Sequence, residues 1–352
     1  MTFKDDNKAY ETWLRQQCDV VEADLATKHA TIKENAFVFL RGTYFRWART
    51  IEAICPELKD APKVLAVGDL HMENFGTWRD ADGRLVWGIN DFDEASRMAY
   101  AFDLVRLVTS ARLAPGMRVP ARTIAQSVLT GYQRGVDEPH PTLLDEHATW
   151  MREFVGTTDE EREKFWKKMQ KLKTARRISR KTAQFLEASY PESASTLRFA
   201  PRTAGVGSLG RPRFVALAQW RGGHVVRESK ALVPSAWDWA HDKAAARSKF
   251  LKAVRSAHRS PDPWLNANDR LIVRRLAADA IKIEFGDLPK KALQKDLFEA
   301  MGFDLGAFHG SDRDDAKAIA KDLRKRNANW LHTAADRAED AVRADFKEWK
   351  GG

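Results

Sequence analysis

Cysteine is scarce in this sequence, and long hydrophobic runs are missing. Only Cys18 and Cys55 occur among the 352 residues, and neither belongs to a Cys-x-x-Cys motif or a Cys/His cluster. The sequence therefore offers neither a disulfide framework nor a zinc site. No apolar run approaches the ~20 residues that span a bilayer, and the acidic, polar start lacks the regions of a signal peptide. We expect a cytoplasmic protein with no membrane partner.

The composition favours a folded protein with anionic partners. With 43% hydrophobic and 31% charged residues, the chain can bury a sizeable core as one two-lobed body or two coupled domains. Its 59 Lys and Arg against 49 Asp and Glu give a formal charge of +10. This balance suits nucleotides, phosphorylated metabolites or nucleic acid without choosing among them.

Hydrophobic periodicity predicts helices and two short strands in the first part of the chain. An amphipathic helix is expected over 8–34, and a mostly helical segment over 37–54. A buried strand is expected at 63–67, and a second at 84–89 that is entered through a turn at 80–83.

The later segments are expected to be helical except for one glycine-rich, β-prone region. A buried helix is predicted over 101–113, with further helices to about residue 190. Residues 199–230 predict a glycine-rich turn followed by a β-hairpin. From 236 to 349 the periodicity predicts mainly helix.

Acidic and amide side chains follow the two predicted strands. Asp69 lies five residues before Asn74, so one loop can offer a carboxylate to an attacking hydroxyl and an amide oxygen to Mg²⁺. Asp91 and Asp93 follow the second strand as metal ligands, with Asp93 as a further ligand or a support. His71 is expected to brace the loop by hydrogen bonds. Any one of these residues alone would be more typical of a turn, but together at two strand ends they predict a catalytic site.

A Gly-x-Gly-x-x-Gly pattern supplies a candidate phosphate site. The motif comprises Gly205, Gly207, Ser208 and Gly210, and a strand follows it rather than a helix. This order disfavours a dinucleotide fold, which places such a motif between a strand and a helix. A glycine-rich hairpin followed by the strand residue Lys230 is the kinase arrangement, in which backbone N–H groups and an ammonium hold the phosphates of ATP.

These motifs resemble known families. The sequence GDLHMEN at 68–74 with NDFD at 90–93 resembles the HGDLHxxN and IDFD motifs of aminoglycoside- and choline-kinase-like enzymes. Together with FLRGT at 39–43 and the glycine-rich motif, they look like the bacterial domain of unknown function 2252. The resemblance implies an α+β, two-lobed protein-kinase-like fold, with a small antiparallel β lobe and a large helical lobe, that uses ATP and Mg²⁺.

The chain order differs from that of ordinary kinases. The glycine-rich motif and Lys230 come after the catalytic loop, so the resemblance implies a circular permutation. We expect units at 1–195 (catalytic loop, metal-binding segment and helices), 196–290 (the β lobe) and 291–352 (C-terminal helices). Asp103 resembles the later helical aspartate of these enzymes. The acid that pairs with Lys230 stays open among four residues: Glu228, Asp238, Asp242 and Glu284.

The sequence thus predicts an ATP- and Mg²⁺-dependent phosphotransferase whose acceptor is an unidentified small molecule or protein. Transfer of the nucleotidyl (AMP) group is an alternative, because the same ligands can present ATP reversed. A second alternative is a non-catalytic nucleotide-binding pseudokinase or a nucleic-acid-binding module that uses ten Lys and Arg at 162–181. Nucleic acid is the less favoured partner, because charge runs are usually solvated surface.

Overall fold

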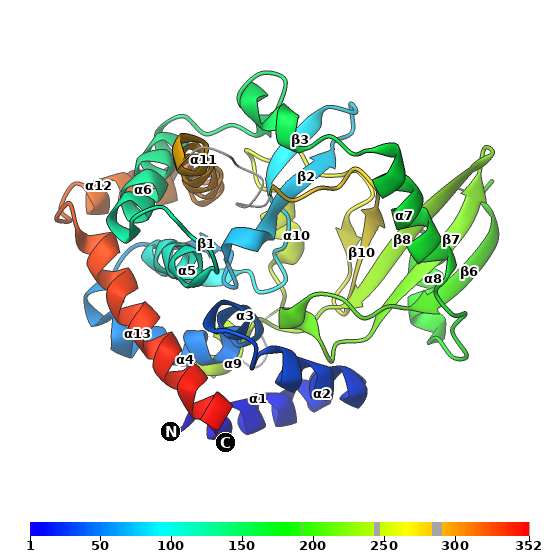
Figure 1. Cartoon of the computed structure of the whole chain (residues 1–352), viewed down its shortest axis with the longest axis horizontal. Helices are drawn as coiled ribbons and strands as arrows, with labels where there is room; N and C mark the ends of the chain where they lie inside the picture. The colour runs from blue at the N-terminus through cyan, green and yellow to red at the C-terminus, as the bar shows by residue number, and fades with distance from the viewer. Residues whose placement is uncertain (192, 243–246, 284–290, 352) are drawn as a thin grey trace.

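The computed structural model describes residues 1–191, 193–242, 247–283 and 291–351. The protein is a mixed α+β fold with many helices and small antiparallel sheets. Figure 1 shows most helices on one side of the molecule and a five-stranded sheet on the other. The predicted α+β class is therefore confirmed.

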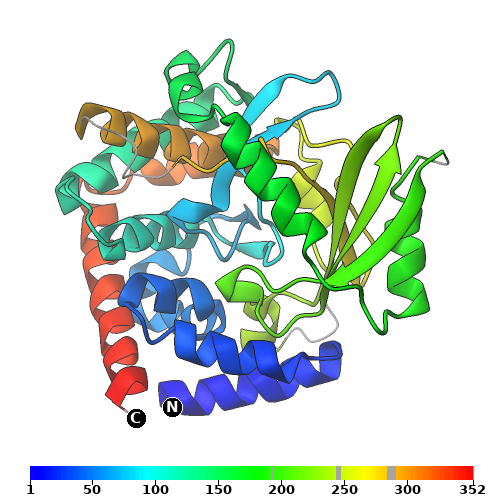
Figure 2. The same cartoon turned by 45° about the vertical axis from the view of Figure 1, so that its right-hand side comes forward.

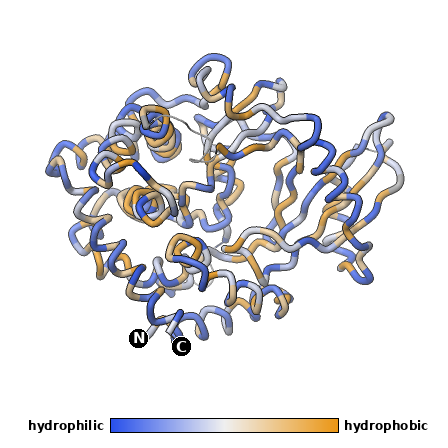
Figure 3. The backbone as a smooth tube through the Cα atoms, viewed as in Figure 1, coloured by the Kyte–Doolittle hydropathy of each residue, from blue (hydrophilic) through white to orange (hydrophobic). Residues whose placement is uncertain are grey.

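One group of helices surrounds the buried helix α5. Its members are α1 (Phe3–Gln17), α2 (Glu22–Thr31), α3 (Ala36–Gly42), α4 (Tyr44–Ile54), α5 (Tyr100–Leu113), α6 (Ala121–Asp137), α9 (Ala236–Ala240), α10 (Phe250–Val254), α11 (Lys291–His309), α12 (Arg313–Leu323) and α13 (Trp330–Gly351). Every residue of α5 except Arg112 is buried. Figure 3 shows hydrophobic residues gathered in the middle of this group and hydrophilic ones along its outer rim.

The two ends of the described chain lie together. Figure 1 shows the termini side by side, where α1 and α13 meet. The backbone N–H of Phe3 donates to Glu348 Oε2 at 3.4 Å. In the part of the chain that the structure describes, no helix combines the length and apolar character needed to cross a membrane.

The larger sheet is built mainly from the glycine-rich, β-prone region. Its strands are β6 (Ser195–Pro201), β7 (Arg213–Trp220), β8 (Gly223–Ala231), β10 (Leu271–Leu276) and β9 (Asn266–Ala267), in that spatial order and all antiparallel. Side chains alternate along β8, so Glu228 and Lys230 share one face. Arg213 lies opposite Lys230, and Arg274 lies opposite Glu228.

Helices cover both faces of this sheet. Helix α7 (Asp159–Gln170) packs with Met169 against Ala200, Val215 and Leu217 on the face that carries Glu228. Helix α8 (Arg180–Glu187) packs with Leu186 on the opposite face. Figure 2 shows α7 on the side of the sheet toward the helical group and α8 on the far side. Both helices therefore pack on the sheet.

Two small sheets position the predicted catalytic loops. Strand β1 (Lys63–Ala66) pairs with β4 (Ser96–Ala99), and β2 (Phe75–Arg79) pairs with β3 (Leu85–Ile89), which also pairs with β5 (Thr142–Leu143). The loop at 67–74 connects β1 to β2, and the loop at 90–95 connects β3 to β4. Both loops thus cross between the same two sheets, which brings their polar residues together.

The predicted elements agree with the structure in part. The strands at 63–67 and 84–89, the helix at 101–113 and the hairpin within 199–230 are confirmed. The single helix predicted over 8–34 is wrong, because residues 18–21 are extended and separate α1 from α2. The mainly helical prediction over 236–349 missed β9 and β10. Strand β9 pairs with β10, and β10 pairs with β8, which lies about 40 residues earlier in the chain.

Candidate functional site

The loop that begins at Gly68 is held by helix α5. Gly68 has a φ of +86°, and a Cβ atom there would lie 2.4 Å from the carbonyl oxygen of Glu94. The Asp103 carboxylate of α5 accepts hydrogen bonds from the backbone N–H groups of Val67 (2.6 Å) and Gly68 (3.0 Å). His309 Nε2 lies 3.1 Å from the same carboxylate. The buried carboxylate of Asp103 therefore holds the start of the loop in place.

Asp69 is an ion-paired carboxylate at the cavity wall. Its side chain is 20% exposed, and its Oδ1 accepts from the Arg106 guanidinium, which is itself almost fully buried. Arg106 lies one helical turn after Asp103 and also donates to the carbonyl of Leu40 at 2.9 Å. Burial raises the pKa of Asp69 to about 7, against the opposing charge of Arg106. Asp69 can therefore gain or lose a proton near neutral pH.

His71 and Asn74 brace the loop through each other. The backbone N–H of His71 donates to Asn74 Oδ1 at 2.7 Å, and His71 Nδ1 accepts from the N–H of Glu73 at 3.2 Å. Burial holds the pKa of His71 well below its usual range, so the ring is neutral. The carbonyl of Asn74 accepts from the N–H of Asn90 at 2.9 Å. This last bond ties the first loop to the second.

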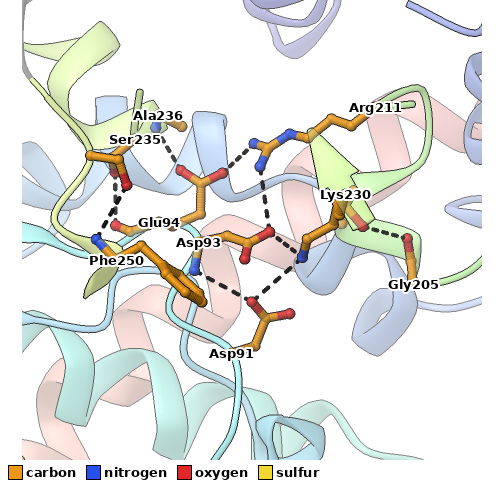
Figure 4. A network of polar contacts seen from close by, with 12 residues as sticks. Asp91, Asp93, Glu94, Gly205, Arg211, Lys230, Ser235, Ala236 and Phe250 are labelled. Carbon is orange, nitrogen blue, oxygen red and sulfur yellow. Dashed lines mark hydrogen bonds and ion pairs between the residues drawn. The ribbon is translucent and has the colours of Figure 1, made fainter. Parts of the chain in front are cut away.

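The second loop supplies two carboxylates with different surroundings, as Figure 4 shows. The Asp93 carboxylate is buried and pairs with the Lys230 ammonium, and Arg211 lies 3.8 Å away. Asp91 is 38% exposed at its side chain, and its Oδ1 lies 3.8 Å from Lys230 Nζ. Burial and the charge of Asp91 raise the pKa of Asp93 to about 6. Burial alone would raise the pKa of Asp91, but Lys230 and Arg274 hold it below its usual range.

Lys230 finds its acid in the second loop. Of the four acids left open by the sequence, Glu228 pairs with arginines and Asp238 accepts from Ser96 Oγ at 2.8 Å. Asp242 makes no contact with Lys230 in the described structure, and Glu284 lies outside the described residues. The partner is Asp93, which the sequence assigned to metal binding or support. Arg211 is a second cation near Asp93. Its guanidinium pairs with Glu94 and donates to Tyr10 Oη at 3.2 Å.

The glycine-rich loop lies against Asp69. A Cβ atom on Gly207 would lie 3.1 Å from Asp69 Oδ2 and 3.0 Å from the carbonyl oxygen of Arg41. Ser208 Oγ accepts from Arg213 Nη2 at 2.7 Å. Gly210 has a φ of +96°, and its carbonyl accepts from the N–H of Val21 at 2.9 Å. Segments more than 130 residues apart in the chain therefore meet at one point.

A cavity of about 500 Å³ joins these groups. Most of the predicted site residues line it, namely Asp69, His71, Asn74, Asp91, Asp93, Gly205, Gly207 and Ser208. Gly210 does not line it, and Lys230 lines a much smaller adjoining cavity together with Asp91 and Asp93. A volume of this size suits a nucleotide or a drug-sized ligand.

Sequence reasoning missed the arginines of the site. Arg106 pairs with Asp69, Arg211 reaches the second loop, and three more surround Glu228, namely Arg202, Arg213 and Arg274. Arg106 had a signal in the sequence, since it stands within an otherwise apolar stretch of a predicted buried helix, three residues after Asp103. The others lie in β-strands or loops, where spacing alone does not indicate which face a residue occupies.

The residues present fit a magnesium ion bound together with phosphates. No group of three or more His, Cys, Asp and Glu side chains within the described ranges can hold a metal by itself. Mg²⁺ in nucleotide sites needs fewer protein ligands, because it takes one or two carboxylates and completes its shell with phosphate oxygens and water. Asp91 offers a carboxylate at the cavity, and Asn74 offers an amide oxygen that accepts one hydrogen bond from the N–H of His71 and keeps a second lone pair, whereas Asp93 is engaged by Lys230.

Comparison with known proteins gives one match. A family model described as "Uncharacterized protein conserved in bacteria (DUF2252)" matches residues 20–203 and 198–351, which together span nearly the whole chain. No curated protein and no solved structure matches significantly.

Proposed function

The chain belongs to the DUF2252 family, and from that premise we propose that it is an ATP- and Mg²⁺-dependent phosphotransferase with an acceptor hydroxyl on a small molecule or protein. One observation carries the proposal. Gly207 of the glycine-rich loop lies directly against Asp69, at a cavity that also exposes Asn74 and Asp91. Phosphoryl transfer requires this combination: hydrogen-bond donors that hold the phosphates, ligands for the metal ion, and a carboxylate that orients the nucleophile.

Each residue has a role that follows from its surroundings. Asp69 orients the acceptor hydroxyl and accepts its proton, a task suited to a carboxylate whose pKa is about 7. Asn74 and Asp91 would hold Mg²⁺, which neutralises charge on the phosphate oxygens. Asp93 acts as a support, because it fixes Lys230 beside the phosphates.

We further propose that the fold is kinase-like, two-lobed and circularly permuted. In support, residues of the glycine-rich loop and of the sheet line one cavity together with residues of the loops at 67–74 and 90–95. The chain order reverses that of ordinary kinases, because the glycine-rich motif and Lys230 follow the loops at 67–74 and 90–95. Function follows from the geometry of a site rather than from the order of its parts.

Calorimetric titration of Mg²⁺ and ATP into the purified protein tests the proposal. We expect ATP to bind at least about tenfold tighter with Mg²⁺, and this effect of Mg²⁺ to be lost in Asp91→Asn. A matched control is Asp82→Asn, because Asp82 is an exposed acid in the β2–β3 turn and does not line the cavity. Failure of the wild-type protein to bind ATP with Mg²⁺ would remove the proposal.

Nucleic-acid binding through the basic segment at 162–181 is a second candidate function. Its ten cations are all exposed, namely Arg162, Lys164, Lys167, Lys168, Lys171, Lys173, Arg176, Arg177, Arg180 and Lys181. However, Phe165 and Trp166 pack on the sheet, so these rings are engaged rather than free for base stacking. Affinity for single-stranded RNA that falls steeply between 50 and 200 mM salt, without any ATP turnover, would favour this candidate.

A further inference from the structure

Three arginines surround one glutamate on the face of the sheet toward the cavity. We call Arg202, Arg213 and Arg274 the arginine trio. Glu228 is fully buried at the centre. Arg213 Nη1 lies 2.6 Å and Arg274 Nη2 2.8 Å from Glu228 Oε1, and Arg202 pairs with Oε2. The pKa of Glu228 is about 2, because burial is outweighed by the charges of Arg274, Arg213 and Arg202. One carboxylate therefore stands against three guanidinium groups, which leaves two positive charges.

The trio faces the cavity rather than only the protein interior. All three arginines line the main cavity, and Arg202 and Arg274 are 20% and 35% exposed at their side chains. Arg213 also donates to Ser208 Oγ, which ties the trio to the glycine-rich loop. Guanidinium groups with spare N–H donors are well suited to phosphate oxygens.

The trio occupies the sheet immediately beyond Lys230. Glu228 and Lys230 lie two residues apart on one face of β8, and the next residue on that face, Val226, is covered by α7. A nucleotide that placed its nucleoside on this part of the sheet would set it over Glu228 and the arginines. Nucleoside rings favour apolar walls with a few placed polar groups, whereas this surface is strongly charged.

Apolar lining is found on another wall of the cavity. There Trp78 of β2 and Ile281 line it, and the N–H of Thr77 donates to the carbonyl of Ile281 at 2.8 Å. The cavity thus has a cationic wall on the sheet and a partly apolar wall beside β2. This polarity matches a nucleoside triphosphate whose phosphate tail points toward the sheet.

We propose that the arginine trio binds the β- and γ-phosphates of ATP, so that the α-phosphate lies at Asp69 and Asp91 and the enzyme transfers the nucleotidyl group. This inference rests on the ATP and Mg²⁺ site of the proposed function, and it replaces phosphoryl transfer from the γ-phosphorus by nucleotidyl transfer from the α-phosphorus. The acceptor oxygen forms a bond to the α-phosphorus, and the bond from that phosphorus to the α,β-bridging oxygen breaks. The acceptor proton passes to Asp69, and pyrophosphate leaves with the electron pair. The products are a nucleotidylated acceptor and pyrophosphate.

Calorimetric titration of ATP, pyrophosphate and AMP in the presence of Mg²⁺ tests the inference. We expect Arg202→Gln and Arg274→Gln each to weaken ATP and pyrophosphate binding about tenfold, because each removes charge-assisted hydrogen bonds to phosphate, while AMP affinity stays unchanged. Two arginines still hold Glu228 in each variant. Arg221→Gln is the matched control, since Arg221 is exposed in the β7–β8 turn. Unchanged ATP and pyrophosphate affinities, or a loss confined to AMP, would overturn the inference while leaving ATP binding itself in place.

A second measurement uses the unaltered protein. Water can replace the acceptor, so slow hydrolysis of ATP labelled at the α- or γ-phosphate reports the reacting phosphorus. We expect AMP and pyrophosphate, and an analogue with a methylene group between the α- and β-phosphorus atoms should block the reaction. Formation of ADP and phosphate would overturn nucleotidyl transfer but support phosphoryl transfer. Absence of ATP binding would instead refute the proposed function.

Discussion

Gly207 lies so close to Asp69 that a side chain there would fit only if its neighbours shifted. A Cβ atom at this position would lie 3.1 Å from Asp69 Oδ2 and 3.0 Å from the carbonyl oxygen of Arg41. The glycine-rich loop and the catalytic-loop candidate are therefore in contact, although the sequence places them far apart. Their contact makes the cavity a single site rather than two unrelated motifs.

Gly207→Ala tests this close approach. The added methyl group has to displace the loop or Asp69, and such overpacking costs about 1–3 kcal/mol. We expect ATP affinity to fall about tenfold, because the backbone N–H groups of the loop move away from the phosphates. Gly223→Ala is the matched control, since the nearest atom to a Cβ there is 3.8 Å away. Equal ATP affinities for the two variants would contradict the contact as a determinant of binding.

Arg106 is predicted to stabilise the protein mainly by neutralising Asp69. Arg106→Met leaves a largely buried carboxylate without its cation, a change that costs about 3 kcal/mol of unfolding free energy for a buried pair. Adding Asp69→Asn should recover at least about 1 kcal/mol, because the unpaired charge is then removed. Urea denaturation of the single and double variants measures both values. A double variant no more stable than Arg106→Met would argue against the ion pair.

The two acids of the second loop are predicted to behave differently. Asp93→Asn removes the close partner of buried Lys230 and should lower the unfolding free energy by about 3 kcal/mol. Asp91→Asn alters a half-exposed side chain, so it should change stability by less than about 1 kcal/mol while abolishing Mg²⁺-dependent ATP binding. Thermal denaturation and calorimetry separate these effects. The reverse pattern would assign the metal to Asp93.

Asp69 predicts a specific pH dependence. Its pKa is raised from the ordinary 3.8 to about 7, so the folded state favours the protonated form. Its contribution to stability is fully present below about pH 4 and is lost as the pH rises to about 7. Relative to Asp69→Asn, the wild type should thus lose unfolding free energy across this window. Catalysis needs the ionised form, so turnover should rise with pH through about 7. A stability difference that does not vary between pH 4 and 8 would contradict the raised pKa.

The sequence predicted the parts of the site better than their connections. Asp69, Asn74, Asp91 and the glycine motif each follow from a local pattern at a strand end or turn, and the structure brings them, except Gly210, to one cavity. The pairing of Lys230 with Asp93 joins residues 137 positions apart, so no local pattern encodes it. The strand β10 was not predicted for the same reason, because its partner β8 is distant in the sequence.

Local periodicity also failed where tertiary contacts decide the backbone. Residues 18–21 fit an amphipathic helix, but Val21 donates its N–H to Gly210 and starts a new helix. That contact holds α2 against the glycine-rich loop. Lys28 of the same helix, whose pKa burial lowers to about 8, donates to the carbonyl of Gly207 at 3.4 Å. Such contacts depend on the assembled fold and show how α2 supports the glycine-rich loop.

The most direct test of the account is the affinity of the protein for ATP with and without Mg²⁺, measured by calorimetry on wild type and Asp91→Asn. The account predicts binding of one ATP per chain to the wild type, at least about tenfold tighter with Mg²⁺, and loss of that metal effect in Asp91→Asn. Binding that ignores Mg²⁺, or no binding of ATP to a folded wild-type protein, would contradict it.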